Sequence, residues 1–241
     1  MKLTYEKASL GAVQKRLDVL GVKGAWAQSD GARVSVFLPG GRRHEDVRRN
    51  LSMPGRLELA FVVEGEVKAT ELGDVALKRD SPHGGTFLAG RTREAVEAAL
   101  GHAVMPKGRL LVSEDDTEGY RTWVVEAPPA VTGDHLVEAK ALNDENLGSI
   151  AVAIAFDDTG KAQFADATAR GVDRRLAIIV DGNVLSAPVV RERIRGGRAN
   201  ITLGRGATPD DAKVLAAALE GGAFPEAAVL VGEEAYAPRE R

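Results

Sequence analysis

Residues 175–190 read RLAIIVDGNVLSAPVV, and this stretch decides the fold. Its five consecutive apolar residues, 176–180, are typical of a strand that is buried on both faces. Asp181-Gly182-Asn183 is the strongest turn signal in the chain, because an Asp-Gly pair favours the tight turn of a β-hairpin. The second apolar run, 184–190, predicts the returning strand. We therefore expect a β-hairpin at the centre of this protein.

Strands and helices alternate on both sides of the hairpin. The expected elements are a strand at 150–156, a helix at 160–170, a strand at 200–203, a helix at 210–219 and a strand at 228–231. The helix at 210–219 has the clearest start, since Thr208 is a capping residue, Pro209 suits the first turn, and two acidic residues complement the helix dipole. This half of the chain is predicted to be α+β.

The first sixty residues show a second α+β pattern. The expected elements are a strand at 2–5, a helix that ends at Gly21, strands at 25–28 and 33–38, a short helix around 47–51, and a strand at 56–62. The order βαββαβ is the split βαβ pattern of ferredoxin-like domains. Between the two halves, residues 64–130 are less regular and predict a helix at 92–100 and a strand pair at 110–112 and 122–125.

Composition bounds the class of protein. The chain has 241 residues, 44% hydrophobic and 28% charged, which fits one large or two smaller globular domains. A net charge of −3 and an aromatic content of 5% argue against a nucleic-acid partner. No apolar run is long enough for a signal peptide or a membrane span. If the protein works outside the cytoplasm, we expect its export signal or membrane anchors on flanking sequence or on another chain.

Residues for catalysis or metal binding are sparse. The chain has no cysteine, and its four histidines have no metal-site spacing, so neither a metal nor a cofactor is expected. The acidic pairs Asp157-Asp158 and Asp210-Asp211 fit helix capping better than acid–base chemistry. Trp26 and Trp123 are expected in the core or between lobes. The basic residues of segment 42–49 suggest a solvated helix face or, alternatively, contact with anionic lipid.

Several segments carry a family resemblance. They are residues 131–136, 151–156, 160–168 and 175–190, followed by 194–197, 212–219 and 222–225, with 15–22 and 33–40 near the N-terminus. Together they resemble the first periplasmic domain of SecD and fused SecDF translocases. The stretch 176–188 is the most specific of them.

The resemblance implies a fold and a function. It implies an α+β protein with a ferredoxin-like base lobe, formed by residues 1–110 with 200–241, and a head lobe with a mixed or antiparallel sheet, formed by residues 111–199. It further implies a non-catalytic, extracytoplasmic domain, membrane-anchored only through flanking segments. Its expected partners are unfolded or translocating polypeptide and other Sec translocon subunits.

The candidate residues follow from this expectation, because a substrate without fixed sequence must be bound through apolar contacts and strand edges. The candidates for the head's core and groove are Ile154, Phe156, Phe164, Ile178, Ile179, Val189 and Val190. Gly133, Gly182 and Pro188 are assigned to backbone geometry. Two alternatives stay open: a stand-alone SecD-like adaptor for a fixed protein partner, and a hydrolase with a perturbed carboxylate pair around Asp157 or Asp210.

Overall fold

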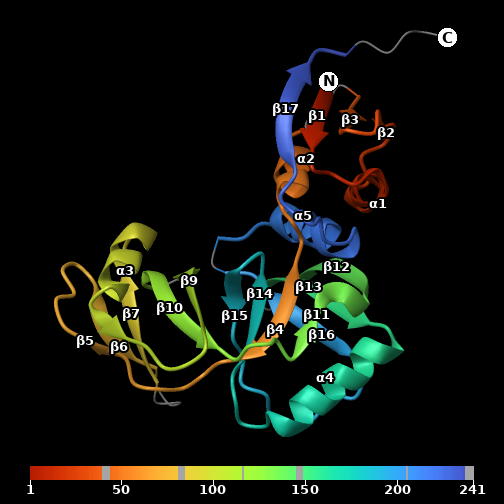
Figure 1. Cartoon of the computed structure of the whole chain (residues 1–241). Helices are drawn as coiled ribbons and strands as arrows, with labels where there is room; N and C mark the ends of the chain where they lie inside the picture. The colour runs from red at the N-terminus through yellow and green to blue at the C-terminus, as the bar shows by residue number, and fades with distance from the viewer. Residues whose placement is uncertain (40–43, 81–84, 116, 145–148, 205, 237–241) are drawn as a thin grey trace.

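A computed structural model of the chain describes residues 1–39, 44–80, 85–115, 117–144, 149–204 and 206–236. Over these residues the chain forms antiparallel β-sheets and five α-helices, which confirms the predicted α+β class. The helices are α1 (Leu10–Leu20), α2 (His44–Ser52), α3 (Arg93–Leu100), α4 (Asp158–Arg170) and α5 (Pro209–Glu220), with a 3-10 turn at Gly133–His135. Figure 1 shows that the chain forms three parts: an N-terminal sheet with its helices, a central part, and a third part beside the central one.

The N-terminal part is a four-stranded antiparallel sheet. Its strands, in spatial order, are β17 (Val229–Glu234), β1 (Lys2–Glu6), β3 (Arg33–Phe37) and β2 (Trp26–Ser29). Side chains of α1, α2 and α5 join those of the sheet in one core. The C-terminal α5 and β17 thus complete the helix–strand pattern that β1, α1, β2 and β3 begin, and the two ends of the chain share one sheet.

The sixth element of the predicted βαββαβ order belongs to another sheet. Strand β4 (Leu57–Phe61) pairs with β14 (Leu176–Val180) and not with β1. The reason is that β4 is apolar on both faces: Leu57 and Leu59 enter one core and Ala60 enters a second. A strand of this kind needs cover on both sides, whereas β1 is buried only at alternate positions.

The central part consists of two sheets and α4. The first sheet has the order β11 (Val131–Thr132), β4, β14, β15 (Asn183–Ser186), and the second has the order β12 (Leu136–Asp144), β13 (Ser149–Phe156), β16 (Arg198–Thr202). Both sheets, α4 and one face of α5 enclose the largest apolar core. The opposite face of α5, with Val214 and Ala217, packs in the N-terminal core. A helix that is apolar on both faces is buried between layers, and α5 does this here.

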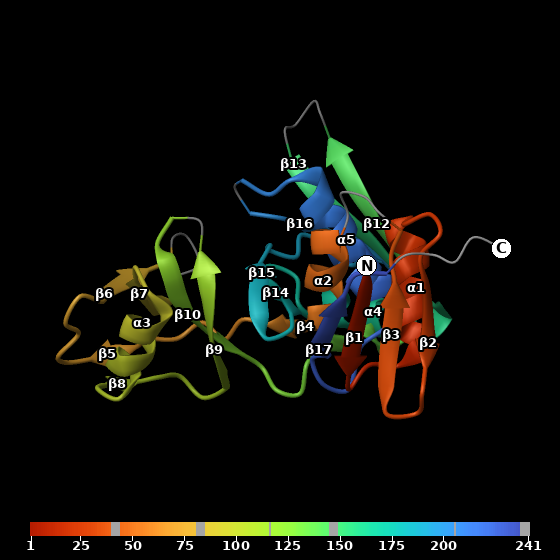
Figure 2. The same ribbon diagram turned by 90° about the horizontal axis from the view of Figure 1, so that it is seen from above.

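The third part lies to one side, as Figure 2 shows. Its main sheet has the order β6 (Ala76–Arg79), β7 (Thr86–Gly90), β10 (Gly119–Val125), β9 (Arg109–Asp115), with α3 and the small pair β5 (Lys68–Ala69) and β8 (Ala103–Val104). Trp123 and Val125 of β10 meet Ala177 and Ile179 of β14 in a separate cluster. The predicted helix at 92–100 and the strand pair at 110–112 and 122–125 are confirmed, as α3, β9 and β10.

Two local predictions need correction. The central hairpin is present, but β15 ends at Ser186 and not near Val190, because Pro188 has no N–H to donate to a strand ladder. Trp26 was expected in the core or between lobes, yet 41% of its surface is exposed, and it stacks on Phe37 with ring centroids 3.9 Å apart. Trp123, at 8% exposed, is buried as expected.

The division into base and head lobes stays a prediction. The hydrogen-bonded pair β4 and β14 joins residues from both sides of the predicted boundary. No helix within the described ranges is long and apolar enough to cross a bilayer.

Candidate functional site

An apolar cavity of about 340 Å³ lies between the two central sheets, beside α4. Its apolar lining comes from β4, α4, β14, the segment after the hairpin and β16: Leu59, Phe164, Leu176, Ile178, Pro188, Val189, Val190, Ile194 and Ala199. Phe164 and Ile178 are also members of the central core. The cavity is therefore an open continuation of that core, in the size range of pockets that hold small ligands or apolar side chains.

Strand β16 forms one wall of the cavity and is a free edge of its sheet. Ala199 and Asn200 line the cavity, and no described strand pairs with the outer side of β16. The N–H of Phe156 donates to the carbonyl of Gly197 at 3.0 Å. Because bonded residues alternate in an antiparallel ladder, Ala199 bonds to β13, while the N–H and carbonyl of Asn200 point away from it. Unpaired backbone groups thus adjoin an apolar cavity.

The structure gathers some of the predicted groove residues and separates others. Phe164, Ile178, Val189 and Val190 line the cavity, with Val189 half-buried at its rim. Ile154 and Phe156 of β13 are buried in the same core without lining the cavity. Ile179 points to the opposite face of β14, toward Trp123. Adjacent positions on a strand face opposite ways, so Ile178 and Ile179 could not share one groove.

The residues assigned to backbone geometry lie near the same elements. Gly182 has a φ of 81° in the turn between β14 and β15. A Cβ on Gly133 would stand 3.1 Å from the Cβ of Leu57. Pro188 is exposed at the rim of the cavity, and its carbonyl accepts the N–H of Leu176 at 2.9 Å.

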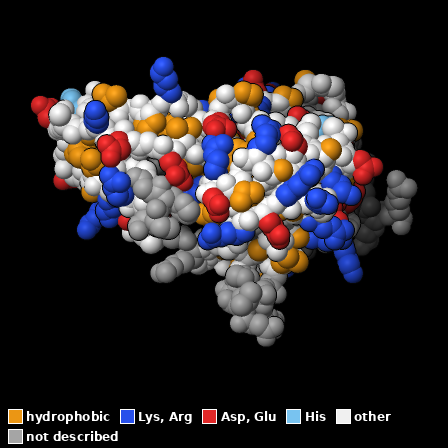
Figure 3. Space-filling model, turned by 90° about the horizontal axis from the view of Figure 1, so that it is seen from below, with side chains coloured by type: hydrophobic (Ala, Val, Ile, Leu, Met, Phe, Trp, Pro, Cys, Tyr) orange, Lys and Arg blue, Asp and Glu red, His pale blue; other side chains and the backbone are white. Residues whose placement is uncertain are grey.

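A basic cleft adjoins the apolar cavity. Lys161 of α4 lines it together with Arg193 and Arg195, and Asp158 is its acidic member. Ile194, between the two arginines, lines the apolar cavity instead. Figure 3 shows Lys and Arg side chains gathered on this face, over the region that α4 occupies. Sequence reasoning missed this cleft, although the alternation in residues 191–195, RERIR, was its visible signal.

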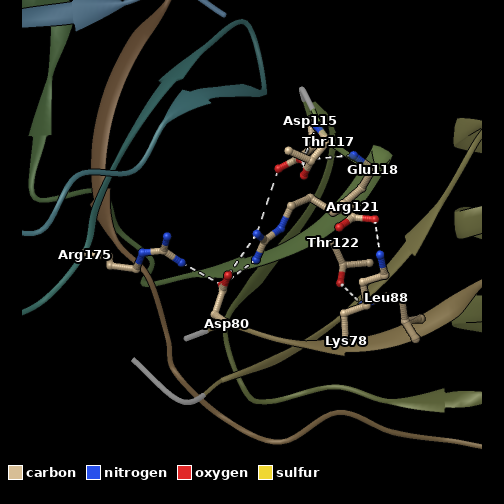
Figure 4. A network of polar contacts seen from close by, with 9 residues as sticks. All are labelled: Lys78, Asp80, Leu88, Asp115, Thr117, Glu118, Arg121, Thr122 and Arg175. Atoms are coloured by element: carbon tan, nitrogen blue, oxygen red, sulfur yellow. Dashed lines mark hydrogen bonds and ion pairs between the residues drawn. The ribbon is translucent and has the colours of Figure 1, made fainter. Parts of the chain in front are cut away.

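A partly buried charge cluster joins the third part to the central part. Asp80, just after β6, accepts hydrogen bonds from Arg121 of β10 at 2.6 Å and from Arg175, just before β14, at 2.7 Å (Figure 4). The guanidinium of Arg121 also lies 3.9 Å from the Trp123 ring centroid. Burial opposes ionisation of Asp80, but bonds from the two arginines hold the pKa of Asp80 below its ordinary value. All three charges are paired, so the cluster fastens two parts together.

The acidic pairs that could have served a hydrolase act as helix caps. Asp157 caps α4 by accepting the N–H of Gly160 at 2.8 Å. This bond, and then one with His135, lowers the pKa of Asp157, whereas a general acid needs a raised pKa. Asp211 forms a capping box with Thr208 at the start of α5. In the described part of the chain no group of three or more His, Cys, Asp or Glu side chains could hold a metal ion.

Both described arginines of the basic segment 42–49 form ion pairs. Arg48 pairs with Glu233 of β17, and Arg49 pairs with Asp211 of α5. Arg42 and Arg43 lie outside the described residues. The paired arginines join α2 to its neighbours.

Comparison with known proteins gives consistent matches. The family described as "SecDF, P1 head subdomain" matches residues 109–226. The protein translocase subunit SecD of Desulfurispirillum indicum is 32% identical over 233 residues, which cover 95% of this chain and 40% of that protein. The translocase subunit SecDF of Thermus thermophilus is 30% identical over 218 residues, covering 88% of this chain and 25% of that protein. The chain thus spans less than half the length of these relatives.

The fold agrees with a solved structure described as "Structure and function of a membrane component SecDF that enhances protein export". That structure matches 98% of this chain and 100% of its own chain, with a TM-score of 0.64 at 23% identity. The sequence matches reach almost the whole chain, and the fold match does the same. This protein therefore belongs to the family of SecD and SecDF protein translocase subunits, within their first periplasmic domain.

Proposed function

We propose that this chain is the polypeptide-binding, non-catalytic domain of a SecD-type translocation subunit, on the extracytoplasmic side of a membrane. Its partners in this role are translocating polypeptide and other Sec translocon subunits. Membership in the SecD and SecDF family supports a place in protein export. The binding role has separate support from the geometry of the cavity.

The observation that carries the proposal is the contact between the apolar cavity and the free edge of β16. A translocating polypeptide is unfolded and has no fixed sequence, so a binding site can use only its backbone groups and its apolar side chains. Asn200 offers an outward N–H and carbonyl for the backbone, and the cavity beside it accepts an apolar side chain. Both requirements are met within one wall of the protein.

The predicted groove residues take different parts in this proposal. Phe164, Ile178 and Val190 form the floor of the cavity, and Val189 with Pro188 forms its rim. Ile154 and Phe156 support the floor from the core. In the same proposal the head lobe supplies most of this site, Leu59 and Asn200 come from the base lobe at the junction of the two, and the base lobe, with the N-terminal sheet, holds the site near the membrane.

Binding of unfolded peptides to a cavity-filled variant tests the proposal. Val189→Trp places a bulky ring at the half-buried rim. Fluorescence polarisation with extended peptides of about 12 residues, each with one central Phe or Leu, measures affinity. We expect the peptides to bind the unaltered chain, and the variant to bind at least ~10-fold more weakly, since a large apolar side chain contributes about 1.5–3 kcal/mol when buried.

The matched control is Val104→Trp, because Val104 is 69% exposed on β8 of the third part. This variant should bind as the unaltered chain does. Failure of all peptides to bind the unaltered chain, or equal loss of binding in both variants, would overturn the proposal.

A further inference from the structure

The basic cleft and the apolar cavity share one wall, the segment 191–195. Arg191, Glu192 and Ile194 line the apolar cavity, while Arg193 and Arg195 line the cleft. The N–H of Ile194 donates to the hydroxyl of buried Thr168 at 2.9 Å, which ties the segment to α4. The apolar cavity and the basic cleft therefore lie side by side, and this bond fixes the segment between them.

A close approach of the chain to α4 fixes the other end of this wall. Gly197 has a φ of 63°, and a Cβ there would stand 2.8 Å from the Cβ of Lys161. Only glycine tolerates this backbone conformation and this contact together. Lys161 is thereby kept beside the arginine segment.

The charge of this wall is opposite to that of the whole molecule. Residues 191–195 contain three arginines and one glutamate, a formal charge of +2, whereas the chain carries −3. Lys161, Arg191, Arg193 and Arg195 are exposed, and no ion pair joins any of them to another described residue. A cluster of exposed cations without internal partners favours an anionic ligand and repels a cationic one.

We propose that the cavity and the cleft form one composite site for a polypeptide segment in which acidic residues lie close to an apolar residue. This inference rests on the proposed function and specifies its substrate class. The apolar side chain fills the cavity, and carboxylates two to four residues away face Lys161, Arg193 and Arg195. An extended chain advances about 3.3 Å per residue, so this spacing covers ~7–13 Å, enough to pass from the cavity across Ile194 to the cleft.

Peptides that differ only in flanking charge test the inference. Three peptides of about 12 residues share a central Phe and carry Asp, Gln or Lys at the flanking positions. In fluorescence polarisation at about 0.05 M salt, we expect the acidic peptide to bind ~5-fold more tightly than the neutral one, and the basic peptide to bind more weakly than both. At about 0.5 M salt the three affinities should converge.

Arg193→Gln with Arg195→Gln should abolish the preference for the acidic peptide and leave the neutral peptide's affinity within ~2-fold. The matched control is Lys7→Gln with Arg33→Gln, which removes the same charge from exposed positions of the N-terminal part and should leave the preference intact. Unchanged thermal unfolding of both double variants shows that folding is retained.

The outcomes separate this inference from the function on which it rests. If all three peptides bind equally at low salt and Val189→Trp weakens all of them, the charge preference is wrong and the polypeptide-binding function stands. If none binds, both fail. If vesicles containing anionic lipid bind the chain through Arg193 and Arg195 and displace the acidic peptide, the cleft faces a membrane surface and the inference is overturned.

Discussion

Asp80 and Arg175, 95 residues apart in the sequence, form an ion pair with a 2.7 Å contact between the third part of the molecule and the central sheets. Arg121 completes the cluster from β10, with only 8% of its side chain exposed. Ser113 of β9 adds a second link, because its hydroxyl accepts the N–H of Val184 in β15 at 2.8 Å. Arg175 also forms an isolated β-bridge with Val189. A residue of the charge cluster therefore pairs directly with a residue of the cavity rim.

Asp80→Asn should weaken this fastening. The substitution keeps the shape of the side chain but removes the negative charge that two partly buried guanidinium groups share. We expect the free energy of unfolding to fall by about 2 kcal/mol, within the range for a buried polar group that loses a partner. Hydrogen exchange should become faster in β10 (Gly119–Val125). The control Glu66→Gln breaks an exposed pair in the same part and should change stability by less than ~0.5 kcal/mol. Unchanged exchange in β10 would contradict the role of Asp80.

The same carboxylate predicts a pH dependence. The bonds of Arg121 and Arg175 outweigh burial and depress the pKa of Asp80 below its ordinary 3.8 in the folded protein. A depressed folded-state pKa means that the unfolded chain binds a proton first as pH falls. The contribution of Asp80 is therefore complete above about pH 5 and is lost as pH falls below 3.8 through the folded-state pKa. Urea unfolding of the unaltered chain and of Asp80→Asn should differ most near neutral pH and converge in acid; a constant difference would argue against this linkage.

Arg16 is a second charged residue on which the fold depends, and it is completely buried. Its guanidinium donates to four carbonyls at 2.6 to 2.8 Å: those of Asn50, Met53, Pro54 and Gly222. It also lies 3.8 Å from the centroid of the Phe224 ring. Burial lowers the pKa of Arg16 to about 10, so the group stays charged at neutral pH. These contacts join α1 to the chain segments before β4 and after α5.

Arg16→Met should therefore destabilise the N-terminal part. It keeps an unbranched apolar stem but leaves four carbonyls without their donor, for which we expect a loss of at least ~3 kcal/mol. Arg16→Lys should recover part of this loss, because one ammonium group cannot reach all four carbonyls. Lys15→Met, at the exposed neighbouring position, is the control and should have little effect. Guanidinium unfolding monitored by circular dichroism measures the stability of each variant. Equal midpoints for the Arg16→Met and Lys15→Met variants would refute the stabilising role of Arg16.

Elements with local signals were predictable from the sequence. The central hairpin depends on Asp181-Gly182-Asn183, and the start of α5 depends on Thr208 and Asp211, which form the observed capping box. Both are contacts between near neighbours in the chain. By contrast, β12 (Leu136–Asp144) was not predicted, because its Glu, Lys and Ala residues do not favour strands. Its long pairing with β13 determines its structure.

The pairing of strands that lie far apart in the chain could not be predicted from the sequence. The strand at β4 was predicted, but nothing nearby in the sequence indicated that β14 would be its partner and β17 the partner of β1. The same holds for the candidate site. Ile178 and Val190 were recognised as apolar, while the free edge of β16 and the cleft beside it depend on which strands end each sheet.

The free edge of β16 allows a test in which the backbone, and not a side chain, is altered. Asn200→Pro removes the outward N–H and leaves the bonds of Ala199 and Ile201 to β13 in place, so the fold should tolerate it as an edge-strand proline. Loss of one backbone hydrogen bond to a bound peptide corresponds to about 1 kcal/mol, and we expect ~5-fold weaker binding in fluorescence polarisation. Asn200→Ala keeps the N–H and should bind as the unaltered chain does.

Ile201→Pro is the opposite control, since its N–H faces β13 and its loss should destabilise the sheet. Equal affinity of Asn200→Pro and Asn200→Ala, with both variants folded, would mean that bound polypeptide does not pair with β16. The cavity would then bind side chains alone, and affinity would depend on the apolar residue and not on an extended backbone. The proline pair therefore separates strand addition from simple apolar binding at the same wall.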